Sequence, residues 1–179
     1  MICLLFVAAC SGNADAGKSE KTANADKATS SSSREASSEA EKSTLKTDKP
    51  YINRLLPEAQ RIEQEYGIPV ATTVAIAIHE TGWGKYEIGQ NNHFGLRCAS
   101  NDCITLNHSG TAISYETCPD EAECFNMFAE SLTELSQGKP SDLRVIYQNG
   151  YATSPKWVNK VRRIRRQVRR TLKAAGYQA

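Results

Sequence analysis

The sequence has no long hydrophobic run, few aromatic residues and almost no net charge. The longest apolar stretch, Ile2–Ala9, is far shorter than the roughly 20 residues that a membrane-spanning helix needs. Aromatic residues make up 7% of the 179, and 22 Lys and Arg oppose 20 Asp and Glu, for a formal net charge of +2. These absences exclude an integral membrane protein and a chain that is basic throughout, so we expect no nucleic-acid partner.

Motifs of metal chemistry are also missing. The sequence contains no C-x-x-C, and His108 has no zinc-type spacing from the cysteines. His79-Glu80 begins like the H-E-x-x-H helix of zinc proteases, but Trp83 stands where the second histidine is needed. We therefore expect no metal and no organic cofactor.

The first ten residues resemble the end of an export signal, because an apolar segment runs into small residues and a cysteine. Val7-Ala8-Ala9-Cys10 resembles a bacterial lipobox, in which the cysteine is lipidated and becomes the mature N-terminus. The alternative is an ordinary, cleaved signal peptide. Ser11 after the cysteine favours transport onward to the outer membrane. We expect a periplasmic lipoprotein that contacts the membrane only through this anchor.

Residues 11–49 have little to bury. They contain nine serines, seven basic and seven acidic residues, and Leu45 as the one large aliphatic residue. Such a segment cannot offset its conformational entropy by burial, so we expect a disordered tether, or a tail without function. The folded domain is predicted to span residues 50–179.

Charge is unevenly divided within this predicted domain. Residues 50–142 carry five basic and thirteen acidic residues, whereas residues 143–179 carry ten basic residues and no acidic one. The basic segment has two interpretations. It is either a solvated face that aids solubility or a surface attracted to an anionic wall polymer or membrane.

Four cysteines lie in the predicted domain: Cys98, Cys103, Cys118 and Cys124. An even number behind an export signal indicates disulfides formed in an oxidising compartment. Three connectivities are possible, and we favour Cys98–Cys103 with Cys118–Cys124 because each pair brackets a short polar loop. A zinc site or a reactive thiol is the alternative.

Hydrophobic periodicity predicts an α+β domain that is mainly helical. A final helix is expected after Ser154 as its cap and Pro155 in its first turn, with Trp157 opening its buried stripe. The other predicted elements are helices at 50–66, 70–80, 119–137 and 141–148, and a small hairpin formed by strands 104–106 and 111–115.

Glu80 ends the most apolar of these predicted helices. A carboxyl group at such a position is expected to lose hydration of its charged form, which favours the protonated acid. A protonated Glu can donate its proton to a leaving oxygen, as in glycoside hydrolysis. The structural alternative is a Glu that caps the helix or forms a salt bridge.

Three sequence blocks carry a resemblance to a known family. They are Glu80-Thr81-Gly82-Trp83-Gly84, the segment Gly89-Gln90-Asn91-Asn92-His93-Phe94-Gly95-Leu96, and Gly150-Tyr151-Ala152-Thr153-Ser154-Pro155-Lys156-Trp157. They resemble the glucosaminidase family of peptidoglycan hydrolases, glycoside hydrolase family 73, over roughly residues 52–173. The resemblance implies a lysozyme-like fold, with a helical body and a small β lobe flanking a substrate groove. Thr81, His93 and Arg97 depart from the family pattern, and the cysteine-bearing hairpin is shorter than usual.

The resemblance also implies roles for individual residues. Glu80 would be the general acid, and Tyr151 would orient the substrate or the attacking water. Trp83, Asn92 and Phe94 would line the groove, although core packing is the alternative for the two aromatic rings, as it is for Tyr151.

A second carboxylate is expected in the β lobe, where Glu116 is the nearest analogue of the family's residue. Glu121 and Glu123 compete with it, although they suit the first turn of a helix. Wide separation of two carboxylates predicts inversion, close approach predicts retention, and the substrate's own N-acetyl group is a third possible nucleophile.

The resulting hypothesis is an exported hydrolase that cuts peptidoglycan glycan strands at the β-1,4 bond after N-acetylglucosamine. The alternatives are a lytic transglycosylase or muramidase on the same scaffold, and a glycan-binding module without catalysis. The sequence does not indicate an oligomeric state.

Overall fold

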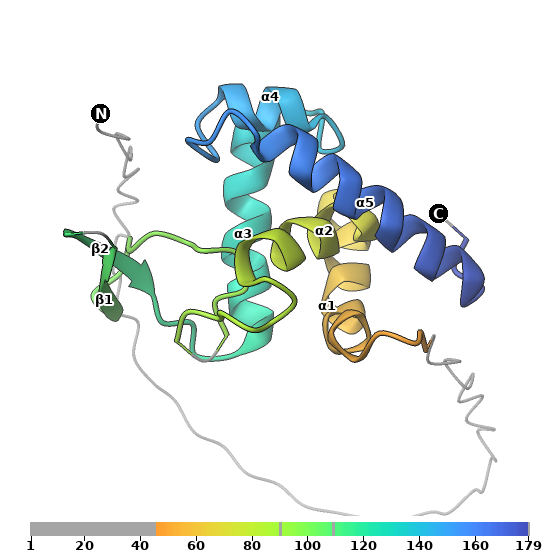
Figure 1. Cartoon of the computed structure of the whole chain (residues 1–179), viewed down its shortest axis with the longest axis horizontal. Coiled ribbons are helices and arrows are strands. Elements are labelled where there is room, and N and C mark those ends of the chain that lie inside the picture. Colours follow the sequence, from red (N-terminus) through yellow and green to blue (C-terminus); the bar gives the residue numbers. More distant parts are fainter. Residues whose placement is uncertain (1–45, 90, 109, 179) are drawn as a thin grey trace, which may run out of the picture. The chain divides into compact units, whose positions relative to one another are not determined.

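The computed structural model describes residues 46–89, 91–108 and 110–178. The predicted export signal, Cys10 and nearly all of the predicted tether lie outside the described residues. The elements, in chain order, are helices α1 (Pro50–Tyr66) and α2 (Val70–Thr81), strands β1 (Cys103–His108) and β2 (Thr111–Glu116), and helices α3 (Glu121–Ser136), α4 (Leu143–Gln148) and α5 (Trp157–Ala174) (Figure 1). The predicted α+β class, mainly helical with a small hairpin, is confirmed. None of the described helices combines the length and apolar character that crossing a bilayer requires.

Helix α2 forms the centre of the helical body. All nine residues from Val70 to Ile78 are buried, so this helix has almost no solvated face. It packs against α1 on one side and α5 on the other (Figure 1). Each fully buried Val or Ile side chain stabilises the fold by about 1.5–3 kcal/mol, which makes α2 a rigid support for the residues at its C-terminal end.

Helix α1 begins beside residues that were predicted to end the tether. Thr47 is buried, and its backbone N–H and its hydroxyl both donate to the side-chain oxygen of Asn53, at 2.7 and 2.8 Å. Residues 46–49 are thus part of the described fold. Gly67 ends the helix as predicted, with a left-handed φ of 67° that glycine adopts without strain.

Two of the later helices begin after an aspartate cap. The Asp120 carboxylate accepts the Glu123 N–H, so α3 starts after Asp120 and not at Pro119. Asp142 caps α4 in the same way. The prediction that Ser154 caps α5 was wrong, because the Ser154 carbonyl accepts the Trp157 N–H and closes a separate turn before that helix.

Strands β1 and β2 pair in antiparallel register, from Cys103 opposite Glu116 to His108 opposite Thr111. Among the described residues, this hairpin packs against none of the helices. An isolated bridge between Arg97 and Tyr115 joins it to the loop that follows α2. The hairpin therefore forms a small lobe beside the helical body (Figure 1).

Candidate active site

A tight turn ends α2 directly after Glu80. The buried Thr81 hydroxyl donates to the Ala77 carbonyl at 2.7 Å and accepts the Gly84 N–H at 2.9 Å. The same hydroxyl lies 2.9 Å from the Tyr51 hydroxyl, which ties the turn to α1. These hydrogen bonds of Thr81 hold the backbone in place directly after Glu80.

Three successive residues of this turn are left-handed. Gly82, Trp83 and Gly84 have φ values of 59°, 68° and 77°. At Gly84 a side chain would also collide with Tyr51, because a Cβ there would lie 2.6 Å from the ring. This geometry explains why the motif needs glycine at these positions, and it makes Trp83 an unusual non-glycine residue in the left-handed region.

Glu80 itself is exposed, whereas its neighbour Thr81 is buried. The dehydrated environment expected from the apolar sequence is therefore not found in the free protein, because Glu80 lies on the outward side of the last turn of α2. Its Oε1 accepts the indole N–H of Trp157 at 2.9 Å. Gly95 lies near the second oxygen, because a Cβ at this glycine would be in ordinary van der Waals contact with Oε2, at 3.9 Å.

Trp157 is the residue whose role the sequence analysis missed. It was predicted only as the first member of the buried stripe of α5, and its ring is indeed buried. Its indole N–H nevertheless reaches a carboxylate 77 positions earlier in the chain. The available signal was the block Gly150–Trp157, which carries Trp157 together with Tyr151.

Tyr151 lies beside this pair. Its ring centroid is 5.2 Å from that of Trp157, and its hydroxyl donates to the Phe94 carbonyl at 3.4 Å. Burial, and to a lesser extent the negative charge of Glu80, raise the pKa of Tyr151 well above its ordinary value. The phenol is therefore a neutral hydrogen-bonding group, and the structure brings it together with Glu80.

His79 is also close to the acid. It is half-buried, and burial lowers its pKa; the negative charge of Glu80 opposes this effect, whereas the positive charge of Lys160 adds to it. The His79 imidazole thus lies near both the negative charge of Glu80 on α2 and the positive charge of Lys160 on α5.

Asn92 and Phe94 lie in the interior of the domain, where they hold neighbouring segments together. The Asn92 amide donates to the carbonyls of Leu96 and Glu116, and its side-chain oxygen accepts the N–H groups of Phe94 and Leu96. Phe94 stacks on Phe128 with 3.9 Å between ring centroids. The exposed fractions are 1% for Asn92 and 3% for Phe94, so both side chains belong to the interior and neither forms the solvent-facing groove wall that was expected.

Trp83 remains available to a ligand. It is 38% exposed, and Tyr86 in the same turn is 64% exposed; these are the large hydrophobic side chains that the described surface presents to solvent. Lys85 Nζ lies 5.0 Å from the Tyr86 ring centroid. Both rings stand a few residues from Glu80 and offer the flat apolar faces on which sugar rings stack. Tyr86 was not among the site residues predicted from the sequence.

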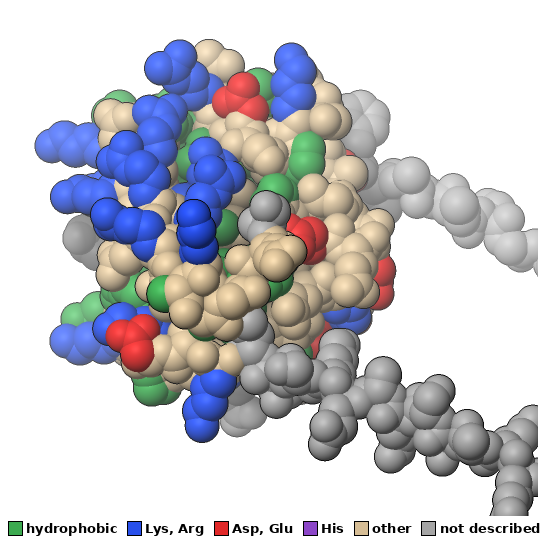
Figure 2. All heavy atoms as spheres, turned by 90° about the vertical axis from the view of Figure 1, so that its right-hand side faces the viewer, with side chains coloured by type: hydrophobic (Ala, Val, Ile, Leu, Met, Phe, Trp, Pro, Cys, Tyr) green, Lys and Arg blue, Asp and Glu red, His purple; other side chains and the backbone are tan. Residues whose placement is uncertain are grey.

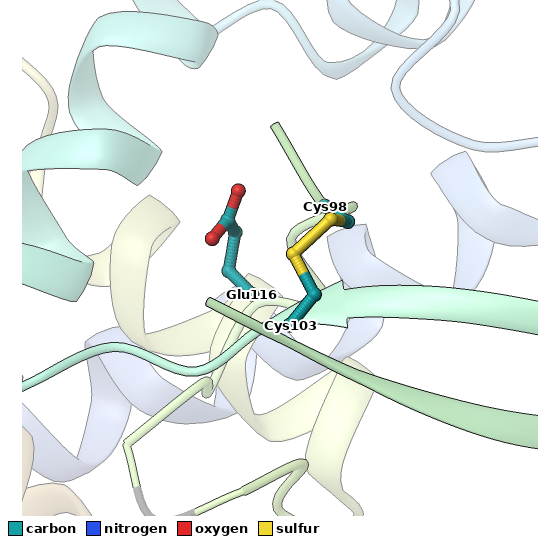
Figure 3. Close-up of side chains that lie close together, drawn as sticks. All are labelled: Cys98, Cys103 and Glu116. Carbon is teal, nitrogen blue, oxygen red and sulfur yellow. A yellow bond between two sulfur atoms is a disulfide. The ribbon is translucent and has the colours of Figure 1, made fainter. Parts of the chain in front are cut away.

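Glu116, the last residue of β2, is buried. Its side chain lies beside the disulfide between Cys98 and Cys103 (Figure 3). Its carboxylate accepts the N–H groups of Ala99 and Ser100, the latter at 2.8 Å, and the Ser100 hydroxyl at 2.7 Å. Burial acts to raise the pKa of Glu116, but these hydrogen bonds outweigh it and lower the pKa overall. Three donors therefore hold this carboxylate in its charged form.

Two disulfides close the loops as favoured from the sequence, Cys98–Cys103 and Cys118–Cys124. The Cys98 and Cys103 sulfurs and a Glu116 oxygen lie within 4.8 Å of one another (Figure 3). Because these sulfurs are bonded to each other, the group offers no thiolate to a metal. The disulfide closes the loop whose Ala99 and Ser100 N–H groups bind the carboxylate.

The competing carboxylates occupy the start of α3. Glu121 accepts the Arg54 guanidinium at 2.6 Å and lies 3.0 Å from Nε2 of the buried His93, whose Nδ1 is 3.1 Å from the Tyr51 hydroxyl. Burial lowers the pKa of His93, while its hydrogen bond with Glu121 acts in the opposite direction. Glu121 is thus part of a network that ties α1 to α3, and Glu123 is exposed in the first turn.

Two open cavities, of about 760 and 440 Å³, border the C-terminal half of α5. Glu80 lines neither of them. The groove that the resemblance predicts beside Glu80 is not one of these cavities.

Solved structures share this fold. A peptidoglycan hydrolase from Sphingomonas sp. A1 is 23% identical, with a TM-score of 0.60 over 70% of this chain and 93% of that one. The glycoside hydrolase domain of FlgJ from Salmonella typhimurium is 17% identical, with a TM-score of 0.58 over 70% of this chain and 91% of that one.

Sequence comparison identifies the family. The peptidoglycan hydrolase FlgJ of Vibrio parahaemolyticus is 25% identical over 150 residues, which cover 69% of this chain and 49% of that protein. The chain thus spans about half the length of this curated relative. The Glucosaminidase family model, described as mannosyl-glycoprotein endo-beta-N-acetylglucosaminidase, matches residues 56–170, which is more than half of the chain. Because this match covers most of the described domain, the chain belongs to the Glucosaminidase family.

Proposed function

We propose that the protein cleaves the β-1,4 glycosidic bond after N-acetylglucosamine in peptidoglycan, with Glu80 as the general acid. The observation that carries the proposal is the position of Glu80 in a member of this family: an exposed carboxyl at the end of a rigid buried helix, bonded to Trp157 and adjacent to Tyr151. The similar proteins named as peptidoglycan hydrolases support the substrate class.

The bound substrate supplies the environment that the free protein lacks. A glycan strand lying over Glu80 displaces water and disfavours the charged carboxylate, so the acid is protonated where its proton is needed. The proton passes to the glycosidic oxygen as the bond from C1 to that oxygen breaks, and the leaving sugar departs as an alcohol. Water then adds its oxygen to C1 and returns a proton to the protein.

Other residues position these groups. The Trp157 N–H stabilises the Glu80 carboxylate that forms after proton transfer. Tyr151, a neutral phenol, orients the sugar or the water by hydrogen bonding, and the exposed rings of Trp83 and Tyr86 stack on sugars.

For Glu116 we propose a positioning role in place of the catalytic one expected from the sequence. Its oxygens already accept three hydrogen bonds inside the disulfide loop, and it is 2% exposed. A base that activates water needs a free oxygen beside the substrate. The anomeric form of the first product distinguishes the inverting route from the two that retain configuration.

Digestion of purified peptidoglycan tests the proposed reaction. Mass spectrometry should find products with reducing N-acetylglucosamine ends, and Glu80→Gln should release none above background. Anhydro ends would instead identify a lytic transglycosylase, and reducing N-acetylmuramic acid would identify a muramidase. Binding to the polymer without any product would identify a glycan-binding module.

We also propose that the protein acts outside the cytoplasm as a lipoprotein anchored through Cys10 to the outer membrane. The proposal rests on the lipobox-like segment at residues 7–10 and on the wall polymer as substrate. Radiolabelled palmitate should enter the wild-type protein and not Cys10→Ala. Labelling of both proteins, or of neither, would contradict lipidation at this cysteine.

A further inference from the structure

The outer side of α5 carries a continuous positive surface. Seven Lys and Arg side chains are exposed there: Lys156, Lys160, Arg163, Arg166, Arg169, Arg170 and Lys173. We call these seven residues the basic face. Their spacings of three, four and seven positions place them on the side of the helix opposite its buried stripe. Figure 2 shows Lys and Arg side chains gathered on this side of the molecule, with few acidic side chains among them.

The basic face is not neutralised within the domain. In the part of the chain that the structure describes, no ion pair joins an α5 residue to a carboxylate. The half-buried Arg165 is different, because its guanidinium donates to the Ser141 carbonyl at 2.7 Å and so serves the fold. Seven like charges on one helix repel one another, which weakens the free domain and favours an anionic ligand.

The basic face begins at the proposed catalytic acid. Trp157, whose indole binds Glu80, follows Lys156 directly, and the charge of Lys160 acts on His79 next to the acid. From there the helix runs 18 residues away from the site. A long ligand that lies over Glu80 can therefore reach the same helix.

The rest of the domain would repel such a ligand. Residues 50–142 carry five basic and thirteen acidic residues, a net charge of −8, whereas residues 143–179 carry +10. An anionic polymer is consequently attracted to one surface only, which orients the domain on it.

The side chains of the basic face favour a polymer over a bilayer. Helices that lie in a membrane interface place Trp, Phe or Leu beside their basic residues. The exposed large hydrophobic residues of the described surface are Trp83 and Tyr86, and they lie at the turn after Glu80, not on α5. Within the described surface, the basic face therefore offers positive charge and no exposed large hydrophobic side chain to a ligand.

We propose that the basic face is a second binding surface for peptidoglycan, which holds the carboxylates of its peptide stems while Glu80 acts on the glycan. The proposal rests on the proposed function and adds a substrate contact outside the catalytic residues. It accounts for a strongly basic helix in a chain whose overall net charge is only +2.

Sedimentation with insoluble peptidoglycan tests this surface. The full chain carrying Glu80→Gln is compared with the same protein carrying Arg163→Gln and Arg170→Gln, and with a matched control carrying Lys139→Gln and Arg144→Gln, two exposed cations outside α5. At about 0.1 M salt the α5 pair should weaken binding about tenfold and the control pair less than twofold. At about 1 M salt, where the Debye length falls from about 10 Å to about 3 Å, the difference should disappear.

Further measurements separate the two proposals. Without the Glu80 substitution, the α5 pair should cleave a soluble, uncharged N-acetylglucosamine oligomer at the wild-type rate, and its melting temperature should match that of the control. Equal sedimentation of all variants would contradict the proposal that the basic face binds peptidoglycan. The proposal would also be contradicted if the α5 pair lost binding to phosphatidylglycerol vesicles but kept its binding to peptidoglycan. If the Glu80→Gln protein released soluble sugar during sedimentation, this would contradict Glu80 as the general acid. It would not contradict the basic face, because sedimentation measures binding separately from cleavage.

Discussion

Two carboxylates of the domain, Glu80 and Glu116, differ in their exposure to solvent and in the number of hydrogen bonds they accept. Glu80 stands at the end of a buried helix, is exposed, and accepts one indole N–H. Glu116 ends β2 beside the loop that the Cys98–Cys103 disulfide closes, is 2% exposed, and accepts three hydrogen bonds. The rigid helical body thus presents a carboxyl group that is open to solvent and to a ligand. The small lobe has no helix packed against it, and its carboxylate organises the surrounding backbone.

The largest expected effect comes from Glu80→Gln. The amide keeps the shape and the contact with Trp157 but cannot donate the proton, so we expect hydrolysis to fall by about 10²–10⁴-fold. Because Glu80 is exposed, the melting temperature should hardly change. Release of soluble sugars from purified peptidoglycan, with a thermal melt of the same sample, measures both. If Glu80→Gln retained activity, Glu80 would not be the general acid, and the proposed difference in role between Glu80 and Glu116 would be wrong.

Glu116→Gln should reverse this pattern. The amide oxygen can still accept the Ala99 and Ser100 N–H groups, but the negative charge is lost and the amide NH2 cannot accept the Ser100 hydroxyl. A lost hydrogen bond to a charged group costs about 1.5–3 kcal/mol. We expect a loss of about 2–3 kcal/mol in the free energy of unfolding, measured by urea denaturation. Glu123→Gln, an exposed carboxylate in the first turn of α3, is the control and should change stability by less than about 0.5 kcal/mol. A stable but inactive Glu116→Gln would restore the catalytic role.

The contribution of Glu116 to stability should also depend on pH. Its pKa is lower in the folded protein than in the unfolded chain, so its stabilisation is complete above the unfolded value of about 4.3 and is lost as the pH falls through the folded value. Urea denaturation between neutral pH and about pH 3 should therefore show a smaller acid-induced loss of stability in Glu116→Gln than in the wild type. Parallel curves for the two proteins would contradict a lowered pKa.

Removal of the disulfide around Glu116 should cost somewhat less. Cys98→Ser with Cys103→Ser opens a loop whose ends are 5 positions apart, for which chain entropy predicts a loss of about 2 kcal/mol. If the loop exists to hold Glu116, combining this change with Glu116→Gln should cost less than the sum of the two. An additive result in a double-mutant cycle would show that the disulfide and the carboxylate act independently.

The smallest change expected is that of Trp157→Phe. It removes one N–H and keeps most of the buried ring, so we expect kcat/KM to fall about tenfold, consistent with the loss of one charge-assisted hydrogen bond. The loss should appear in kcat, because the N–H contacts the carboxylate that forms as the glycosidic bond breaks. Trp83→Phe, which leaves this contact in place, is the control, and an equal loss of kcat in the two variants would contradict a role for the Trp157 N–H.

The fold was predictable where the signal is local. The uniform apolar character of Val70–Ile78 indicates a buried helix, and the left-handed Gly67 ends α1 where the sequence places a break. The pairing of Cys98 with Cys103 was predictable because the two cysteines are only five positions apart, on either side of a short polar loop.

The site was less predictable, because its contacts join distant segments. The bond from Trp157 to Glu80 spans 77 positions, and the burial of Asn92 and Phe94 depends on α3 and β2 packing over them. Glu116 illustrates the same limit. Its residue type suits a catalytic base, but its role depends on which backbone N–H groups surround it, and the sequence does not display them.

The bond between Trp157 and Glu80 has a consequence for biosynthesis. The chain is made from its N-terminus, so the ribosome completes the acid 77 residues before the indole that partners it. An incomplete chain that ends before α5 carries the carboxyl without this partner, and without the helix that packs over α2. The site therefore depends on the last helix of the described domain, which supplies both the hydrogen-bond partner of Glu80 and part of the packing that holds α2.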